Sequence, residues 1–124
     1  MEKILIIDDD PDVITVLQLL LKKKGYQVAT ASREGEAYEQ VATFHPDLIV
    51  MDVLLSGVDG RDICKKLKSS EDLKDILIIM FSGHPSAQKN YADFGADDFL
   101  PKPFQSARLL ERIETHLAKK KASS

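Results

Sequence analysis

Close to its amino end the chain reads Ile4-Leu5-Ile6-Ile7, followed directly by Asp8-Asp9-Asp10-Pro11. Four apolar residues in a row predict a short strand that is buried on both faces of a sheet. Asp10 before Pro11 indicates the start of a helix, because Asp is a favoured N-cap and Pro a favoured first helical residue. A cap needs only one acidic side chain, so Asp8 and Asp9 require another explanation.

Four further apolar runs predict four more strands, at residues 26–29, 48–51, 76–81 and 99–100. Stretches of helical length lie between and after these runs. Five strands alternating with five helices indicate βαβ units and a parallel sheet that is covered on both faces. Right-handed crossovers then favour an α/β fold of the flavodoxin-like, doubly wound (βα)5 type, with the strand order 2-1-3-4-5.

The helical pattern is strongest after the first and fifth strands. Apolar residues recur with helical spacing over residues 13–21, and Gly25 provides a helix end. The last helix, from Phe104 through Leu117, is equally periodic. Residues 37–42 and, more weakly, residues 63–67 also predict helices, the second entered at Asp59-Gly60. The stretch 86–94 has few apolar residues, so its helix is expected to be thinly anchored.

Size and composition exclude several classes of protein. A chain of 124 residues predicts one domain, which we place at residues 1–119, with residues 120–124 as a tail or linker remnant. The net charge of -3 gives no general attraction to nucleic acid or to an anionic membrane. Neither a signal peptide nor a membrane span is expected. The single cysteine, Cys64, fits a core position in a reducing compartment, which predicts a cytoplasmic protein.

Four of the predicted strands end in a polar group. Asp8 and Asp9 follow the first strand, Asp52 the third, Ser82 the fourth and Lys102 the fifth. Because the carboxyl ends of parallel strands lie at one edge of the sheet, we expect these side chains to converge. Three neighbouring carboxylates either raise one another's pKa values or bind a cation, and oxygen ligands with an open face suit Mg²⁺.

Each of these residues alone also has an ordinary structural explanation. A lone Asp at a strand end is usually a loop residue, and Ser82-Gly83-His84-Pro85 is common turn chemistry. The combination is more informative, because a hydroxyl, an ammonium and a metal on one edge are what a phosphoryl group requires. The sequence therefore indicates phosphoryl chemistry at this edge, with both explanations open for Asp52 taken by itself.

Several motifs resemble those of response regulator receiver domains, the phosphorylated modules of two-component signalling. The resemblance covers nearly the whole chain, in order and in spacing, and each motif alone is weak whereas the set is highly specific. The motifs are Ile4-Leu5-Ile6-Ile7-Asp8-Asp9-Asp10-Pro11, Asp47-Leu48-Ile49-Val50-Met51-Asp52, Ile79-Met80-Phe81-Ser82-Gly83 and Gly95-Ala96-Asp97-Asp98-Phe99-Leu100-Pro101-Lys102-Pro103-Phe104.

The resemblance implies that Asp52 accepts a phosphoryl group from a histidine kinase, a phosphotransfer protein or a small acyl or amido phosphate. It also implies a bound Mg²⁺ or Mn²⁺ ion, held by Asp9, by Asp8 through water, by Asp52 and by the backbone carbonyl of Leu54. The chain would be a phosphorylation-dependent switch of a two-component system or phosphorelay. It would catalyse only its own phosphorylation and dephosphorylation, and would not otherwise be an enzyme.

The same resemblance assigns the switching residues. Lys102 would pair with the phosphoryl oxygens, and Ser82 would swing inward to donate a hydrogen bond to one of them. Phe99 matches the aromatic residue whose rotamer follows that movement. The Lys102-Pro103 peptide bond would be cis, which is uncommon for bonds before proline in general.

The sequence departs from the family pattern in two respects near the acceptor and the switch hydroxyl. Ser56 stands where the family usually has Pro, so the loop after Asp52 is expected to be more mobile. Leu54 and His84 occupy the positions that flank the path of the hydrolytic water in this family, and Leu54 offers that water no hydrogen bond. The resemblance therefore implies slow self-dephosphorylation, tuned by these two side chains.

The expected output surface is formed by the helix at 86–94, the fifth strand and the last helix. A downstream protein would bind there without direct contact to nucleic acid or membrane. Solvated charges on a helix face often have no partner, so these positions are candidates only: Gln88, Lys89, Tyr91, Arg108, Glu111 and Arg112.

Two other functions compete with this interpretation. Asp8-Asp9-Asp10 contains the Asp-x-Asp that opens haloacid-dehalogenase-type phosphatases, in which Asp8 would be the nucleophile and Asp10 the general acid. No acidic pair follows Lys102, and the chain has no room for a substrate cap. The other alternative is a receiver fold that only binds proteins and is never phosphorylated. His45 and His116 lack ligand spacing and are interpreted as surface residues.

Overall fold

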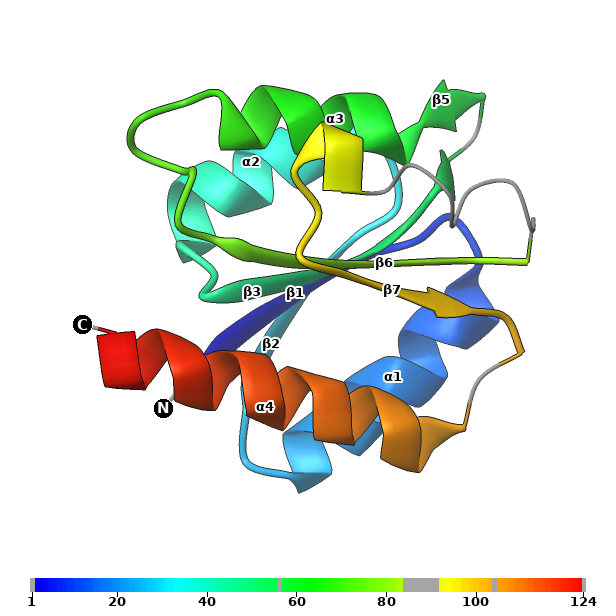
Figure 1. Cartoon of the computed structure of the whole chain (residues 1–124). Coiled ribbons are helices and arrows are strands. Elements are labelled where there is room, and N and C mark those ends of the chain that lie inside the picture. The colour runs from blue at the N-terminus through cyan, green and yellow to red at the C-terminus, as the bar shows by residue number, and fades with distance from the viewer. Residues whose placement is uncertain (1, 56, 84–91, 104, 124) are drawn as a thin grey trace.

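The computed structural model describes residues 2–55, 57–83, 92–103 and 105–123. Its main sheet consists of five parallel strands, with the order β2-β1-β3-β6-β7 (Figure 1). Counting only these five strands along the chain, the order is 2-1-3-4-5, so the predicted doubly wound α/β fold is confirmed. The strands are β1 (Lys3–Ile7), β2 (Gln27–Ala31), β3 (Leu48–Asp52), β6 (Leu77–Ser82) and β7 (Asp98–Pro101).

Helices cover both faces of this sheet. In Figure 1, α2 (Glu34–Phe44) and α3 (Gly60–Lys68) lie above the sheet, and α1 (Pro11–Lys23) and α4 (Ser106–Ser123) lie below it. Side chains of the central strands alternate between two buried apolar clusters, one on each side. Leu5 and Ile7 point toward α2 and α3, whereas Ile4 and Ile6 point toward α1 and α4, which explains the continuous apolar run.

Local sequence signals set the helix ends as expected. The Asp10 side chain accepts a hydrogen bond of 2.9 Å from the backbone N–H of Asp12, and Pro11 begins α1. Asp59 caps α3 in the same way, accepting from the N–H of Arg61 at 2.9 Å. After α1, Gly25 adopts a φ of 95°, a left-handed conformation that glycine reaches without strain.

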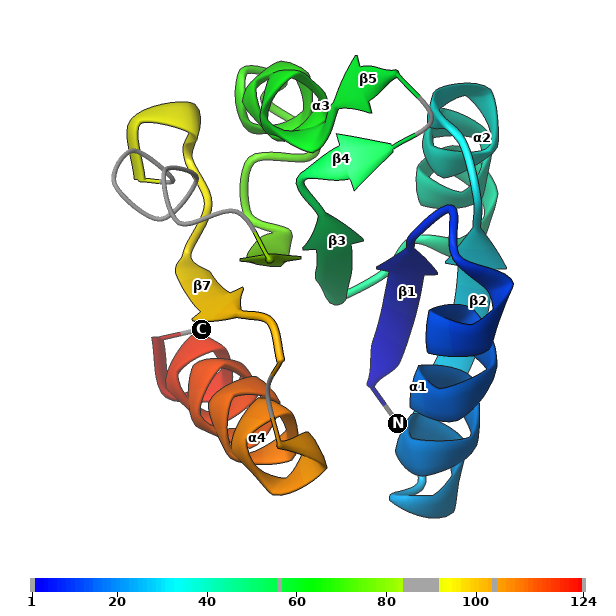
Figure 2. The same ribbon diagram turned by 90° about the vertical axis from the view of Figure 1, so that its right-hand side faces the viewer.

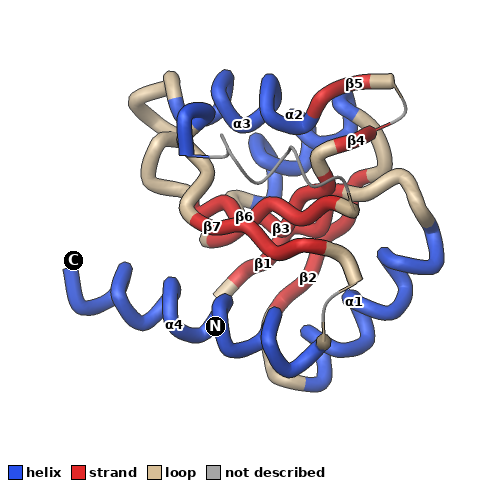
Figure 3. The backbone as a smooth tube through the Cα atoms, turned by 45° about the vertical axis from the view of Figure 1, so that its right-hand side comes forward, coloured by secondary structure: helices blue, strands red, loops and turns tan. Residues whose placement is uncertain are grey.

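A small hairpin was missed by the sequence analysis. Strands β4 (Leu54–Leu55) and β5 (Val58–Asp59) pair in an antiparallel manner directly after β3, outside the main sheet (Figure 3). Two-residue strands are too short for alternation to reveal them. Gly57, with a φ of 84°, lies between the two strands and was the available signal.

The last helix extends into the segment that we interpret as a tail or linker remnant. Helix α4 continues through Ser123 and so includes residues 120–123. Two lysines fix this last turn to the start of the sheet: Lys121 pairs with Glu2 at 2.9 Å, and Lys120 donates to the Asp47 carbonyl at 3.4 Å. These contacts with the start of the sheet help to hold the last turn of α4, whose lysine-rich sequence offers no large apolar side chain to bury.

The predicted helix at 86–94 lies mostly outside the described residues, and its last part, residues 92–94, forms a single 3₁₀ turn. Among the helices of the described ranges, none has the length and apolarity that crossing a bilayer requires.

Candidate functional site

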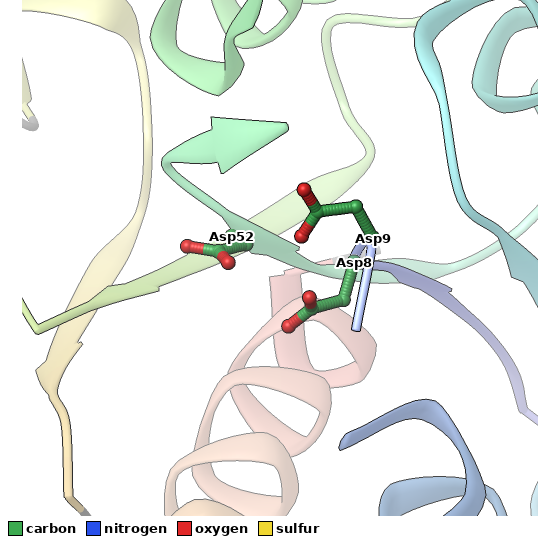
Figure 4. Close-up of side chains that lie close together, drawn as sticks. All are labelled: Asp8, Asp9 and Asp52. Carbon is green, nitrogen blue, oxygen red and sulfur yellow. The ribbon is translucent and has the colours of Figure 1, made fainter. Parts of the chain in front are cut away.

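The three carboxylates that the sequence analysis singled out meet at the carboxyl edge of the sheet. Strands β1 and β3 are neighbours, with Ile7 opposite Met51, so Asp8 and Asp52 emerge side by side. One carboxylate oxygen each from Asp8, Asp9 and Asp52 lies within 4.8 Å of the others. Figure 4 shows the three side chains around a shared space, and Figure 2 shows the neighbouring ends of β1 and β3 that present them.

Lys102 joins this cluster from the end of β7. Its ammonium lies 3.4 Å from an oxygen of Asp52 and 3.6 Å from an oxygen of Asp8. It also lies over the Phe81 ring, 4.7 Å from the ring centre, so a cation–π contact supports its position. This contact of Phe81 was not predicted, because the sequence of a buried apolar strand does not show which charged group will lie over one of its rings. The bond from Lys102 to Pro103 is cis, as predicted.

Burial and mutual repulsion govern the charge of the acidic cluster. Asp8 is fully buried, and this burial raises its pKa to about 6, with the neighbouring charges of Asp52 and Asp9 acting in the same direction. The N–H of Asp10 and the Lys102 ammonium oppose that increase. Burial likewise raises the pKa of Asp52 above its ordinary value, against the opposing effects of Lys102 and the Leu54 N–H. One ammonium therefore does not fully compensate these acids.

The donor set fits a hard divalent cation. All three side chains offer oxygen, and Asp9 is exposed, which leaves an open face for water ligands. Within the described part of the chain, the Oδ2 atom of Asp8 is buried with no hydrogen-bond donor, and the Lys102 ammonium lies 3.6 Å from it. An unpartnered buried carboxylate oxygen is costly unless a cation or a water molecule bound to one satisfies it.

Gly60 lies against the backbone of Asp52, a contact that the sequence did not predict. A Cβ atom at Gly60 would collide with the backbone carbonyl oxygen of Asp52 and lie 3.2 Å from that of Val53. The Gly60 N–H donates to the Val53 carbonyl, and the Val53 N–H donates to the Phe81 carbonyl. The first turn of α3 thus rests directly on the backbone of Asp52, and only glycine permits this approach.

The remaining predicted site residues occupy different environments. Ser82 ends β6 and is buried, one position beyond the Phe81 that pairs with Asp52. Phe99 is buried in the core cluster beside α3. Leu54 is 61% exposed, although its N–H donates to an Asp52 oxygen at 3.3 Å. His84 lies outside the described residues.

His116 is not the surface residue that the sequence suggested, and Arg112, a candidate for the partner surface, shares its contact with Asp98. The Asp98 carboxylate is buried at the start of β7, and Arg112 of α4 approaches it to 2.7 Å. His116 Nε2 lies 2.9 Å from the same carboxylate. Hydrogen bonds from Arg112 and His116 lower the pKa of Asp98, overcoming the opposing effect of burial. This contact between β7 and α4 was not predicted, because Asp98 lies 14 and 18 positions from Arg112 and His116 in the sequence.

Cys64, His45 and the candidate partner residues differ in their exposure to solvent. Cys64 is fully buried, which confirms that it is a core residue. The same burial raises the pKa of its thiol to about 11. His45 is exposed and ends α2 in a left-handed conformation. Among the candidate partner residues, Arg108 and Glu111 are exposed, whereas Gln88, Lys89 and Tyr91 lie outside the described residues.

Comparison with known proteins agrees with this geometry. The response regulator receiver domain family matches residues 4–114, and the chain belongs to that family. It is 40% identical over 121 residues to the response regulator MprA of Mycobacterium leprae, covering 96% of this chain and 52% of that protein. It is 36% identical over 116 residues to the alkaline phosphatase synthesis transcriptional regulatory protein PhoP of Bacillus subtilis, covering 94% of this chain and 48% of that protein.

Solved structures show the same fold. The beryllofluoride-activated receiver domain of RstA from Klebsiella pneumoniae superposes with a TM-score of 0.85 at 30% identity, covering 94% of this chain and 98% of that one. The chain spans about half the length of the curated relatives. It is thus a receiver domain of two-component signalling, a family of signalling switches that bind Mg²⁺ at an acidic cluster like this one.

Proposed function

We propose that the chain accepts a phosphoryl group on Asp52 from a phosphohistidine of a partner kinase or phosphotransfer protein. The observation that carries this proposal is the position of the Asp52 carboxylate, between the acids of β1 on one side and the Lys102 ammonium on the other, 3.4 Å away. A nucleophilic oxygen beside a fixed cation is the arrangement that phosphoryl transfer requires, since this reaction depends mainly on positioning and charge neutralisation.

An oxygen of Asp52 attacks the phosphorus in line with the leaving imidazole nitrogen. The P–O bond forms as the P–N bond breaks, and the imidazole leaves with the electron pair of that bond. Lys102 offsets negative charge on the phosphoryl oxygens, and the Ser82 hydroxyl donates a hydrogen bond to one of them. Mg²⁺ would supply further charge neutralisation, and Asp9, Asp52, the Leu54 carbonyl and, through water, Asp8 would hold it.

The phosphorylated chain then differs from the resting chain at one edge of the sheet. Phosphoaspartate adds negative charge and new acceptor oxygens, which draw Lys102 and Ser82 toward Asp52. These residues end β7 and β6, so the movement reaches Phe99 and the surface formed by β7 and α4. A downstream protein binds this surface, and Arg108 and Glu111 are the exposed candidates among the described residues.

Phosphoryl labelling tests the proposal. The purified chain is incubated with a small acyl phosphate and Mg²⁺, and the labelled peptide is identified by mass spectrometry. We expect one label on Asp52, loss of that label in Asp52→Asn, and strong reduction when EDTA removes the metal. A label on Asp8 would support phosphatase chemistry of the haloacid-dehalogenase type. An unlabelled chain whose melting temperature is indifferent to millimolar Mg²⁺ would support a receiver fold that only binds proteins.

A further inference from the structure

Helix α3 contacts the segment that leads into β7 at two points. Arg61 lies near its start and Lys68 at its end, seven residues apart, which is close to two helical turns and places both side chains on one face. The segment consists of the 3₁₀ turn at residues 92–94, yellow in Figure 1, and the link at residues 95–97. This segment precedes the strand that presents Lys102 to the acidic cluster.

The contact at Lys68 is firm. Its ammonium lies 3.0 Å from an Asp97 oxygen and donates to the carbonyls of Ile76 at 2.6 Å and Lys74 at 3.2 Å. Its stem lies against Gly95, where a Cβ atom would come within 2.8 Å of the Lys68 Cγ. The two carbonyls position the ammonium, whose side chain is only 16% exposed, and its ion pair with Asp97 then holds the link to the end of α3.

The contact at Arg61 is of a different kind. The Asp59 carboxylate holds the guanidinium in a two-pronged pair, with Nη2 at 2.7 Å from one oxygen and Nε at 3.0 Å from the other. This pair aims the guanidinium over the ring of Phe94, 5.5 Å from the ring centre. Phe94 is half-buried, and a cation–π contact at such a site is weak. The 3₁₀ turn is thus held by a positioned but weak contact.

We propose that the Arg61–Phe94 contact restrains the 92–94 turn in the unphosphorylated protein and thereby opposes the response to phosphorylation. This inference rests on the proposed function. Phosphorylation draws Lys102 toward Asp52 and shifts β7, and the link that Lys68 holds at Asp97 acts as a pivot, so the shift of β7 on one side of the link rotates the turn on the other side. Arg61 belongs to α3, which rests on the Asp52 backbone through Gly60, and its contact with Phe94 opposes that rotation of the turn.

The contact then acts on the affinity for a phosphoryl group. An interaction that stabilises the resting state more than the phosphorylated state weakens phosphoryl binding by the same factor. Arg61 is accordingly a positioning residue that acts through Asp59 and Phe94. Its removal is expected to tighten binding, the opposite of what general damage to the site produces.

Beryllofluoride, a phosphoryl mimic, measures this effect in the presence of saturating Mg²⁺. We expect Arg61→Ala and Phe94→Leu each to lower the dissociation constant for beryllofluoride about two- to fivefold, the range given by a partly exposed cation–π contact. The double variant is expected to gain no more than either single variant, because both remove one interaction. Arg61→Ala keeps the α3 cap, since Asp59 accepts from the backbone N–H.

Arg33→Ala is the matched control. Arg33 is the residue directly before α2, and its side chain, 76% exposed, lies 3.9 Å from Glu36, so its removal should leave beryllofluoride binding unchanged. Urea unfolding of each variant verifies that it folds. Unchanged or weaker binding in Arg61→Ala and Phe94→Leu, or fully additive gains in the double variant, would overturn this inference alone. A wild-type chain that binds no beryllofluoride would overturn the proposed function as well.

Discussion

Lys102 and Asp52 are fifty positions apart in the sequence, yet their charged groups lie 3.4 Å from each other at the edge of the sheet. The same ammonium lies 3.6 Å from Asp8, so one cation is shared between two buried carboxylates. This sharing leaves net negative charge in a poorly solvated place, which raises the pKa values of both acids. The site is therefore electrostatically unsatisfied until a further cation arrives.

Asp8→Asn is predicted to stabilise the metal-free protein at pH 7. The amide is neutral and keeps an oxygen that can accept the 2.9 Å hydrogen bond from the Asp10 N–H. The ionised carboxylate is costly because its pKa in the folded protein is about 6, above the ordinary value of 3.8. We expect the free energy of unfolding in EDTA to rise by about 1–3 kcal/mol, measured with urea.

The pH dependence of that difference follows from the direction of the shift. A raised carboxyl pKa stabilises the folded protein while the group is protonated, and this contribution is lost as the pH rises through about 6. Wild type and Asp8→Asn should thus have similar stabilities near pH 4 and diverge toward pH 7. A variant that is less stable than wild type at pH 7 in EDTA would contradict the electrostatic account of the site.

Gly60→Ala is predicted to destabilise the protein and to reduce phosphorylation of Asp52. The new methyl group collides with the Asp52 carbonyl, and relieving that clash must displace either the acceptor or α3. We expect a loss of about 1–3 kcal/mol in urea unfolding. Gly35→Ala is the control, because Gly35 lies in α2 with open space around it and Ala favours the helix by about 0.5–1 kcal/mol. Equal effects of the two substitutions would refute the packing argument.

Leu54→Asn is predicted to accelerate loss of the phosphoryl group. The Leu54 side chain is largely exposed beside the acceptor and provides no hydrogen bond to an approaching water molecule, whereas an amide does. After removal of the phosphodonor, the decay of labelled protein should be several times faster in the variant. A decay rate equal to that of wild type would show that this position does not limit hydrolysis.

The sequence predicted the elements whose signals are local or strongly periodic. The apolar runs located all five strands of the main sheet, and right-handed connections limited their arrangement to doubly wound orders such as the one observed. Convergence of Asp8, Asp9 and Asp52 needed only the rule that parallel strands share a carboxyl edge. Asp10 and Asp59 marked their helix starts because capping depends on the side chain and its immediate neighbours.

Features that depend on tertiary contacts were not predictable in this way. His116 looked like a surface residue because nothing near it in sequence reveals the buried Asp98 that it meets. The continuation of α4 through its last turn was not predicted, because the lysines of that turn find their partners at the start of the sheet, far away in the sequence. Gly60 was recognised as part of a helix start, but its contact with the Asp52 backbone exists only in the folded protein.

A crystal structure of the chain with Mg²⁺ and beryllofluoride tests the central claim most directly. The account predicts beryllofluoride on the Asp52 carboxylate, contacted by Lys102 and by the Ser82 hydroxyl. It also predicts one metal ion bound by Asp9, Asp52 and the Leu54 carbonyl, with Asp8 reaching it through water. Beryllofluoride on Asp8, or a metal ion that does not touch Asp52, would contradict the account.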